Sequence, residues 1–141
     1  MLFFEGALKI KRMRKMKREV IKIPRIELKW SNWIPWHELK ADARKGGINV
    51  PNKPGVYEAK YVGVEQRLTI GRTSSLRRRI KEGLVKGKMG HPSGQKIRAN
   101  ENTSKIIVRL AITDRNAAVE EELHKRHLRK FGKLPKYVEH T

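Results

Sequence analysis

The sequence predicts an α+β domain with a three-stranded, mainly antiparallel sheet flanked by helices. Residues 55–63 alternate between apolar and polar side chains, the period of a strand with two different faces. Residues 105–113, KIIVRLAIT, form a β-branched run suited to a strand buried on both faces. Helical patterns occupy 75–86 and 115–131. With a further strand at 67–72, the order of elements is β-β-α-β-α.

The first two strands are expected to pair as an antiparallel hairpin. Their first member divides its side chains between two faces, with Val56, Glu58 and Lys60 on one and Tyr57, Ala59 and Tyr61 on the other. The residues from Gly63 to Gln66 supply a turn, and RLTIGR returns as the second strand.

The limits of the helices follow from capping residues. Ser74 or Ser75 can cap the first helix. The segment 83–96, rich in Gly and Lys, is expected to be a flexible basic loop. Asp114 can cap the last helix, and Gly132 can end it.

Two regions are expected, a basic N-terminal arm at 1–29 and a domain at 30–141. The run KIKRMRKMKR at 9–18 would repel itself as an isolated helix, so it is either a solubilising tail or a phosphate-binding arm. The whole-chain charge favours phosphate binding. The residues expected to make these contacts are Arg12, Arg14 and Lys15.

Three tryptophans open the domain at every third position. Trp30, Trp33 and Trp36 could stack on nucleic-acid bases or close the edge of a small core, and packing is favoured. The following HELKADARK segment can form a short helix that ends at Gly46-Gly47.

The charge balance predicts a polyanionic partner. Lys and Arg number 34 against 14 Asp and Glu, for a formal net charge of +20. Nucleic acid is the usual partner of so basic a chain, ahead of an anionic membrane surface. The absence of cysteine excludes disulfides, thiol catalysis and Cys-based metal sites. With no signal peptide and no apolar stretch of about 20 residues, an intracellular, cytoplasmic protein is expected.

The last helix carries an acidic side chain on its predicted apolar face. On a helical wheel, Glu120 falls among Ala117, Leu123, Leu128 and Phe131. A carboxylate there is costly unless it is paired or binds a cation. Both an ion pair with an arginine and ligation of a hard cation such as Mg²⁺ fit this position. His124, one turn on, either supports Glu120 or only packs.

Three consecutive arginines follow the second strand. The buried side of their helix is defined by Leu76, Ile80 and Leu84. Arg78 points away from that side, and Arg77 and Arg79 flank it. Position alone does not choose which of the two flanking arginines would reach a phosphate.

The order and spacing of three motifs resemble those of the GIY-YIG nuclease superfamily, in particular its small stand-alone members. The motifs are Gly55-Val56-Tyr57, then Thr69-Ile70-Gly71 with Thr73, Leu76 and Arg79, and finally Glu120 within VEEELH. The resemblance covers residues 54–137 and implies a metal-dependent endonuclease acting on double-stranded DNA.

The resemblance also implies roles for individual residues. Arg79 would bind the scissile phosphate, and Glu120 would hold Mg²⁺ or Mn²⁺. Tyr57 would orient or deprotonate the attacking water. Further contacts to nucleic acid are expected from Arg72, Arg77, Arg78, Lys81, Lys88 and Lys96. Because one site cuts one strand at a time, a homodimer or a specificity partner is left open.

The sequence departs from the family pattern at three points. Thr69 stands where the second motif has a tyrosine, and Gly83 where many members have a histidine. No late asparagine is evident at 136–138. His91 could replace the missing histidine as a base or phosphate contact, or be an ordinary loop residue. The alternative function is a nucleic-acid-binding module of the same fold with weakened catalysis.

Overall fold

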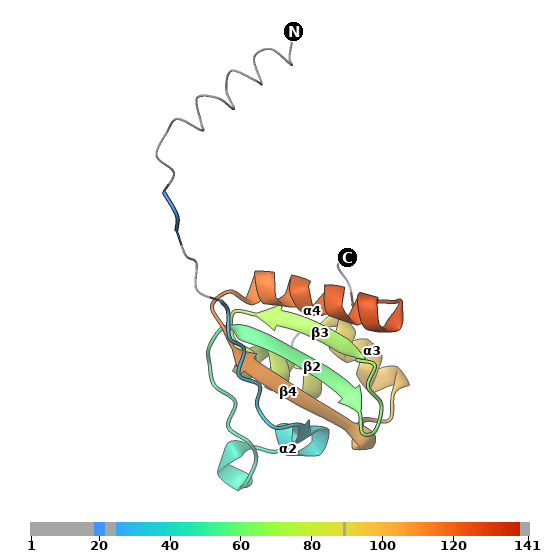
Figure 1. Ribbon diagram of the computed structural model, residues 1–141. Helices are drawn as coiled ribbons and strands as arrows, with labels where there is room; N and C mark the ends of the chain where they lie inside the picture. The colour runs from blue at the N-terminus through green and yellow to red at the C-terminus, as the bar shows by residue number, and fades with distance from the viewer. Residues whose placement is uncertain (1–18, 22–24, 89, 139–141) are drawn as a thin grey trace.

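A computed structural model describes residues 19–21, 25–88 and 90–138 of the chain. It has an α+β fold built on a four-stranded antiparallel sheet (Figure 1). The strands lie in the order β1 (Ile34–Pro35), β4 (Ile106–Ile112), β2 (Gly55–Tyr61) and β3 (Thr69–Thr73). The contacts expected from Arg12, Arg14 and Lys15 lie outside the described residues.

The predicted hairpin is confirmed. Strands β2 and β3 are antiparallel, with Tyr57 opposite Gly71 and Glu58 opposite Ile70. Tyr57 and Ala59 belong to the larger core, whereas Val56 belongs to a smaller cluster on the other face, as the alternation predicts.

The expectation of three strands was wrong, because a fourth forms at the edge of β4. Ile34 pairs with Val108 and Pro35 with Ile107. The sequence gives little sign of this strand, since it has two residues and one is a proline, which is confined to sheet edges and strand ends. Its pairing makes part of the tryptophan segment the edge strand of the sheet.

The segment 83–96 is not a continuous loop. Helix η2 spans Arg78–Val85, and helix α3 spans Pro92–Asn100. Proline at the first position of α3 favours helix initiation, and Ile97 is fully buried in the core. The glycines of this segment lower its helix propensity and therefore favoured the prediction of a loop. The stability of α3 comes from packing instead.

Helix η2 begins at Arg78 and has Arg77 at its N-cap, so neither serine occupies the predicted cap position, and its winding differs from an ordinary α-helix. The Ser75 hydroxyl accepts a hydrogen bond from the Arg78 amide at 3.3 Å. The Lys86 amide bonds the Lys81 carbonyl, five residues back, so the helix is wound as a π-helix.

Helix α4 spans Asn116–Phe131 and ends at Gly132 in the left-handed conformation, as expected. The predicted cap is wrong, since Arg115 occupies that position rather than Asp114. The predicted apolar face is also shifted. Val119 and His127 are the buried residues, while Leu128 is 48% exposed.

The helices cover both faces of the sheet (Figure 1). The larger core joins one face to η2, α3 and α2 (Trp36–Lys40), with the short helices η1 (Ala43–Lys45) and η3 (Thr103–Lys105) in the connections. On the other face, α4 and the segment carrying Leu28 and Trp30 pack over Val56 and Ala111. No helix in the described ranges has the length and apolar character needed to cross a bilayer.

Candidate functional site

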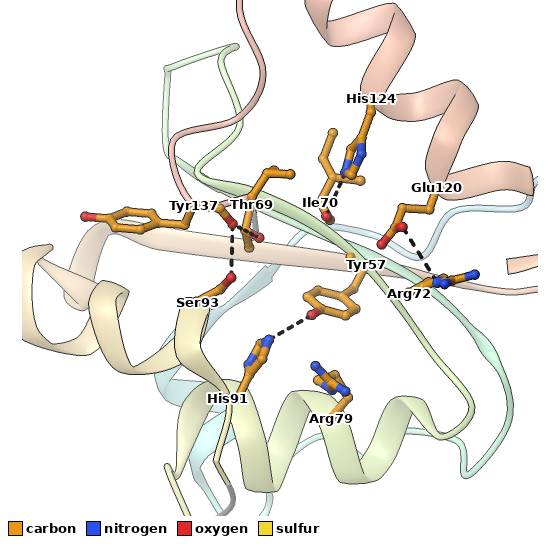
Figure 2. A pocket seen from close by; sticks show the side chains of 12 residues that line it. Tyr57, Thr69, Ile70, Arg72, Arg79, His91, Ser93, Glu120, His124 and Tyr137 are labelled. Carbon is orange, nitrogen blue, oxygen red and sulfur yellow. Dashed lines mark hydrogen bonds and ion pairs between the residues drawn. The ribbon is translucent and has the colours of Figure 1, made fainter. Parts of the chain in front are cut away.

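A pocket of about 310 Å³ opens at the edge of the sheet beside β3. Four of its titratable side chains come from separate parts of the chain: β2 gives Tyr57, η2 gives Arg79, the residue before α3 is His91, and α4 gives Glu120. Figure 2 shows Tyr57 between Glu120 and Arg79, with His91 at its hydroxyl end. The fold thus gathers four predicted site residues that are up to 63 positions apart in sequence (120 − 57).

Tyr57 and His91 form a buried pair. The Tyr57 hydroxyl lies 3.2 Å from His91 Nε2. Gly71 makes this position available, because a Cβ atom there would overlap the Tyr57 hydroxyl. The tyrosine of the first motif therefore needs the space that the glycine of the second motif leaves open.

His91 is a pocket residue rather than an exposed loop histidine, and it is only 4% exposed. Its Cβ lies 3.3 Å from where a Cβ on Gly83 would be, so the glycine leaves room for the imidazole. Burial, and then the charges of Arg79 and Arg98, lower the pKa of His91 from 6.5 to about 4. The ring is therefore neutral at pH 7. Among the described residues, its Nδ1 has no hydrogen-bond partner.

The three consecutive arginines have different surroundings. Arg77 donates from Nε to the Val50 carbonyl at 2.8 Å, on the side of η2 away from the pocket. Arg78 is exposed. Arg79 is half-buried and lines the pocket, and no carboxylate in the described part of the chain pairs with it. Of the three, Arg79 therefore has the charge and the position to bind an anion in the pocket.

Glu120 lies on the opposite wall and is half-buried. Its Oε1 is 3.7 Å from Nε of Arg72, whose side chain is 52% exposed, against 23% for Glu120. The ion-pair reading of Glu120 is thus observed, but as a long contact with an exposed partner. So long a contact leaves the second carboxylate oxygen of Glu120 outside the pair.

His124 has a structural contact of its own. Its Nε2 lies 3.0 Å from the Ile70 carbonyl and must donate to it. Asn116 likewise donates to the Thr73 carbonyl at 2.9 Å. These two side chains of α4 cover the outer edge of β3, which would otherwise expose unpaired backbone groups. They also fix Glu120, on the same helix, over the pocket.

The residues fit a magnesium-type cation better than a fully protein-ligated metal. Within the described ranges, no three His, Asp, Glu or Cys side chains converge to hold a metal. Mg²⁺ keeps several waters and commonly takes one or two carboxylates together with substrate phosphates. Glu120, open on its pocket side, can supply that one carboxylate.

The C-terminal segment forms the remaining wall. Thr69 and Ser93 both donate from their hydroxyls to the Tyr137 carbonyl, at 2.9 and 3.0 Å. The Tyr137 ring points away from the pocket (Figure 2). Its hydroxyl donates to Glu101 at 2.7 Å. Thr69 therefore anchors a backbone segment where the family motif has a phenol. The sequence analysis missed Ser93, Tyr137 and Glu101, because no local pattern predicts these long-range bonds.

Most of the expected nucleic-acid contacts within the domain are at the surface. The exposed ones are Arg72, Arg77, Arg78, Lys88 and Lys96. Lys81 is different, because it is 7% exposed and its Nζ points to the Ala41 carbonyl at 3.4 Å. Its ammonium is not available at the surface for a phosphate.

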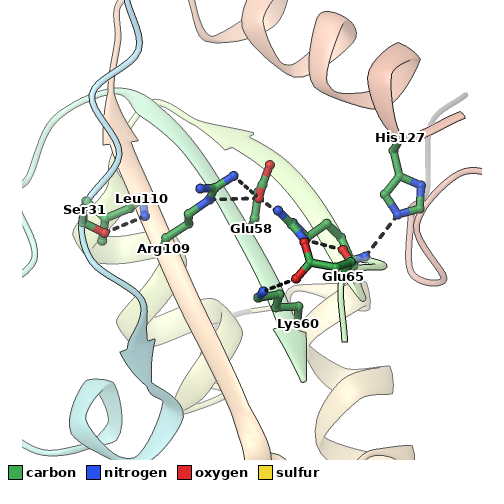
Figure 3. Close-up of polar contacts among 8 residues, drawn as sticks. Ser31, Glu58, Lys60, Glu65, Arg109, Leu110 and His127 are labelled. Atoms are coloured by element: carbon green, nitrogen blue, oxygen red, sulfur yellow. Dashed lines mark hydrogen bonds and ion pairs between the residues drawn. The ribbon is translucent and has the colours of Figure 1, made fainter. Parts of the chain in front are cut away.

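A second polar cluster lies on the opposite face of the sheet and is structural (Figure 3). The buried Glu58 carboxylate accepts from Arg67 Nε at 2.6 Å and from Arg109 at 2.9 and 3.0 Å. Arg109 also stacks over Trp30 and Trp33, at 4.1 and 4.7 Å from the ring centroids. The two tryptophans thus pack on cations of the sheet, and Trp36 is buried in the core.

Comparison of the chain with models of protein families, with curated proteins and with solved structures gave no match in any of the three.

Proposed function

We propose that this protein is a metal-dependent endonuclease that hydrolyses phosphodiester bonds in DNA, with a GIY-YIG-like catalytic site. The observation that carries the proposal is the meeting of Tyr57–His91, Arg79 and Glu120 around one pocket at the sheet edge. A carboxylate able to bind a cation, an arginine that no carboxylate of the described residues pairs with, and a tyrosine–histidine pair are three of the groups that phosphodiester hydrolysis uses.

Substrate binding is assigned to the arginine and to the basic surface around it. The planar guanidinium of Arg79 offers several N–H donors and matches the geometry of a phosphate. The net charge of +20 attracts the DNA backbone from any sequence. Double-stranded DNA is the proposed partner, and its phosphate enters the pocket between Arg79 and Glu120.

Glu120 is the proposed ligand of Mg²⁺ or Mn²⁺. When bound, the cation neutralises the negative charge that develops on the phosphate and on the leaving 3′ oxygen. The half-buried position of the carboxylate on α4, braced by His124 at the β3 edge, keeps the charge at the pocket wall.

Tyr57 and His91 are the proposed proton acceptors. We assign the donor role to the Tyr57 hydroxyl and the acceptor role to Nε2 of neutral His91. A phenolic oxygen can accept a hydrogen bond while its O–H donates one. As the water oxygen bonds to phosphorus and the bond to the 3′ oxygen breaks, the water proton passes to Tyr57. The Tyr57 proton passes to His91, and the departing 3′ oxygen takes a proton from solvent water. The products are a 5′-phosphate and a 3′-hydroxyl.

Conversion of supercoiled plasmid to nicked or linear DNA tests the proposal. The protein is incubated with Mg²⁺, with Mn²⁺ or with EDTA, and Arg79→Gln is compared with Arg77→Gln. Both variants lose one positive charge from the same helix region, but only Arg79 lines the pocket. Cleavage that requires metal, is lost in Arg79→Gln and is kept in Arg77→Gln supports the enzyme.

The alternative function gives a different result in the same assay. Plasmid that is retarded but uncut under every metal condition would overturn the nuclease and favour the nucleic-acid-binding module. Equal cutting by the two arginine variants would show that the pocket is not the catalytic site.

A further inference from the structure

Arg72, which lines the pocket, has two competing partners, Glu120 and a phosphate of the proposed DNA substrate. As an exposed arginine on β3, it is expected to contact DNA, yet its guanidinium Nε lies 3.7 Å from Glu120 Oε1. Glu120 is the proposed cation ligand. Glu120 and a phosphate therefore compete for the single positive charge of Arg72, and a cation on Glu120 would repel that charge.

We propose that Arg72 is a displaceable counter-ion of Glu120. In the DNA-free protein it occupies the carboxylate, and a divalent cation displaces it so that the released guanidinium binds a phosphate of the DNA strand. Arg72 would then be a positioning residue that couples cation binding to DNA binding. This inference rests on the proposed function.

The geometry of the ion pair favours displacement. The contact is single and long, and the Arg72 side chain is 52% exposed. Exposed pairs of this kind change an equilibrium constant by at most about fivefold. Arg72 also lines both the catalytic pocket and the wider groove along α4, so its long side chain has open space on either side of Glu120.

Arg79 does not share this competition. It lies on η2, below Tyr57 in Figure 2, and pairs with no carboxylate of the described chain. Arg79 can therefore bind a phosphate before the cation binds, whereas Arg72 can do so only after the cation has displaced it from Glu120. By linkage, DNA must raise cation affinity by the same factor as the cation raises DNA affinity.

The affinity of the full-length, DNA-free protein for Mn²⁺, measured by electron paramagnetic resonance of the free ion, tests the competition. Arg72→Gln should bind Mn²⁺ about two- to fivefold more tightly than the parent. Lys125→Gln is the matched control, because it removes one positive charge from the same groove but its lysine pairs with Glu121 at 3.1 Å. It should change Mn²⁺ affinity much less than Arg72→Gln, and Glu120→Gln should remove the site.

The second arm measures affinity for a short DNA duplex in a Tyr57→Phe background, which blocks cleavage without changing charge. Mn²⁺ should strengthen DNA binding when Arg72 is present and have a smaller effect in Arg72→Gln. In EDTA, Arg72→Gln should bind DNA almost as well as its parent, because Arg72 is then held by Glu120.

Two failures are distinguishable. If the parent shows Mn²⁺ binding that Glu120→Gln removes, but Arg72→Gln matches the parent, the counter-ion role is wrong and the nuclease proposal stands. If no Mn²⁺ binding depends on Glu120, the cation ligand of the proposed function is itself wrong, and the counter-ion role falls with it.

Discussion

Gly71 and Tyr57 face each other across β3 and β2, and the absence of a side chain at position 71 makes room for the tyrosine hydroxyl. The hydroxyl then reaches His91 Nε2 at 3.2 Å. Two motifs that are separate in the sequence are thus one packing unit, and the unit ends at a titratable pair in the pocket.

Gly71→Ala should therefore displace Tyr57 from His91. The added methyl group overpacks the site, and a loss of about 1–3 kcal/mol of stability is expected, together with most of the cleavage activity. Thermal unfolding and plasmid nicking measure the two effects. Gly90→Ala is the matched control, because a Cβ atom there meets nothing within 4 Å. Equal activity in the two variants would contradict the packing argument.

The stability of the protein should fall on mild acidification because of His91. Its pKa is about 4 in the folded protein, against 6.5 for the ordinary group. Between these values the unfolded chain binds a proton that the folded chain does not, so the free energy of unfolding decreases as the pH falls from 6.5 towards 4. The full shift corresponds to at most about 3 kcal/mol.

Urea unfolding at several pH values checks this dependence. His91→Gln should flatten the decline, whereas the same change at the exposed His37 should leave it intact. A residual slope is expected from His127, whose pKa burial also lowers and which accepts from the Arg67 amide at 3.1 Å. An unchanged slope in His91→Gln would contradict the assignment.

Glu58→Gln should strongly lower the free energy of unfolding, although Glu58 does not line the pocket. It leaves Arg67 and Arg109 without their shared carboxylate on a covered sheet face. Removing one partner of a buried ion pair typically costs about 3–5 kcal/mol. The exposed Glu65, which pairs with Lys60, provides the control, and Glu65→Gln should change little. Denaturant unfolding that ranks the two variants equally would refute a structural role for the cluster.

A tyrosine placed at position 69, where the motif that the chain resembles has one, should destabilise the protein instead of improving it. Thr69 is buried, and its hydroxyl holds the Tyr137 carbonyl. Thr69→Tyr should cost at least about 1–3 kcal/mol by overpacking, while Thr69→Val should cost about 1 kcal/mol for the lost hydrogen bond. Thermal unfolding tests both. A stable Thr69→Tyr variant that cleaves DNA faster than the parent would contradict this expectation, because the pocket could then use a second phenol.

The hairpin and the last helix could be predicted because their signals are local. Alternation in β2 reports its two faces directly, and Gly132 marks the end of α4. Strand β1 and helix α3 could not be predicted in the same way. The first exists through pairing with β4, and the second through burial of Ile97 beneath η2 and the sheet.

The residues that meet at the pocket could be selected from the sequence, but their contacts could not. The motif resemblance selects Tyr57, Arg79 and Glu120, which the fold brings to one pocket. The pairing of Tyr57 with His91 depends on the exact path of the chain through Gly83 and the start of α3, so no sequence period reports it. The helical wheel found Glu120 by treating Leu128 as buried, although Leu128 is largely exposed.

The most direct test of the central claim is plasmid cleavage in Mg²⁺ by Glu120→Gln compared with Glu121→Gln, with DNA affinity measured for both. The two glutamates are adjacent on α4, but only Glu120 of the two lines the pocket with Tyr57 and Arg79, and Glu121 pairs with Lys125 at the surface. The account predicts that Glu120→Gln binds DNA and does not cut it, while Glu121→Gln cuts like the parent. Cleavage by Glu120→Gln at the parent rate would contradict the account.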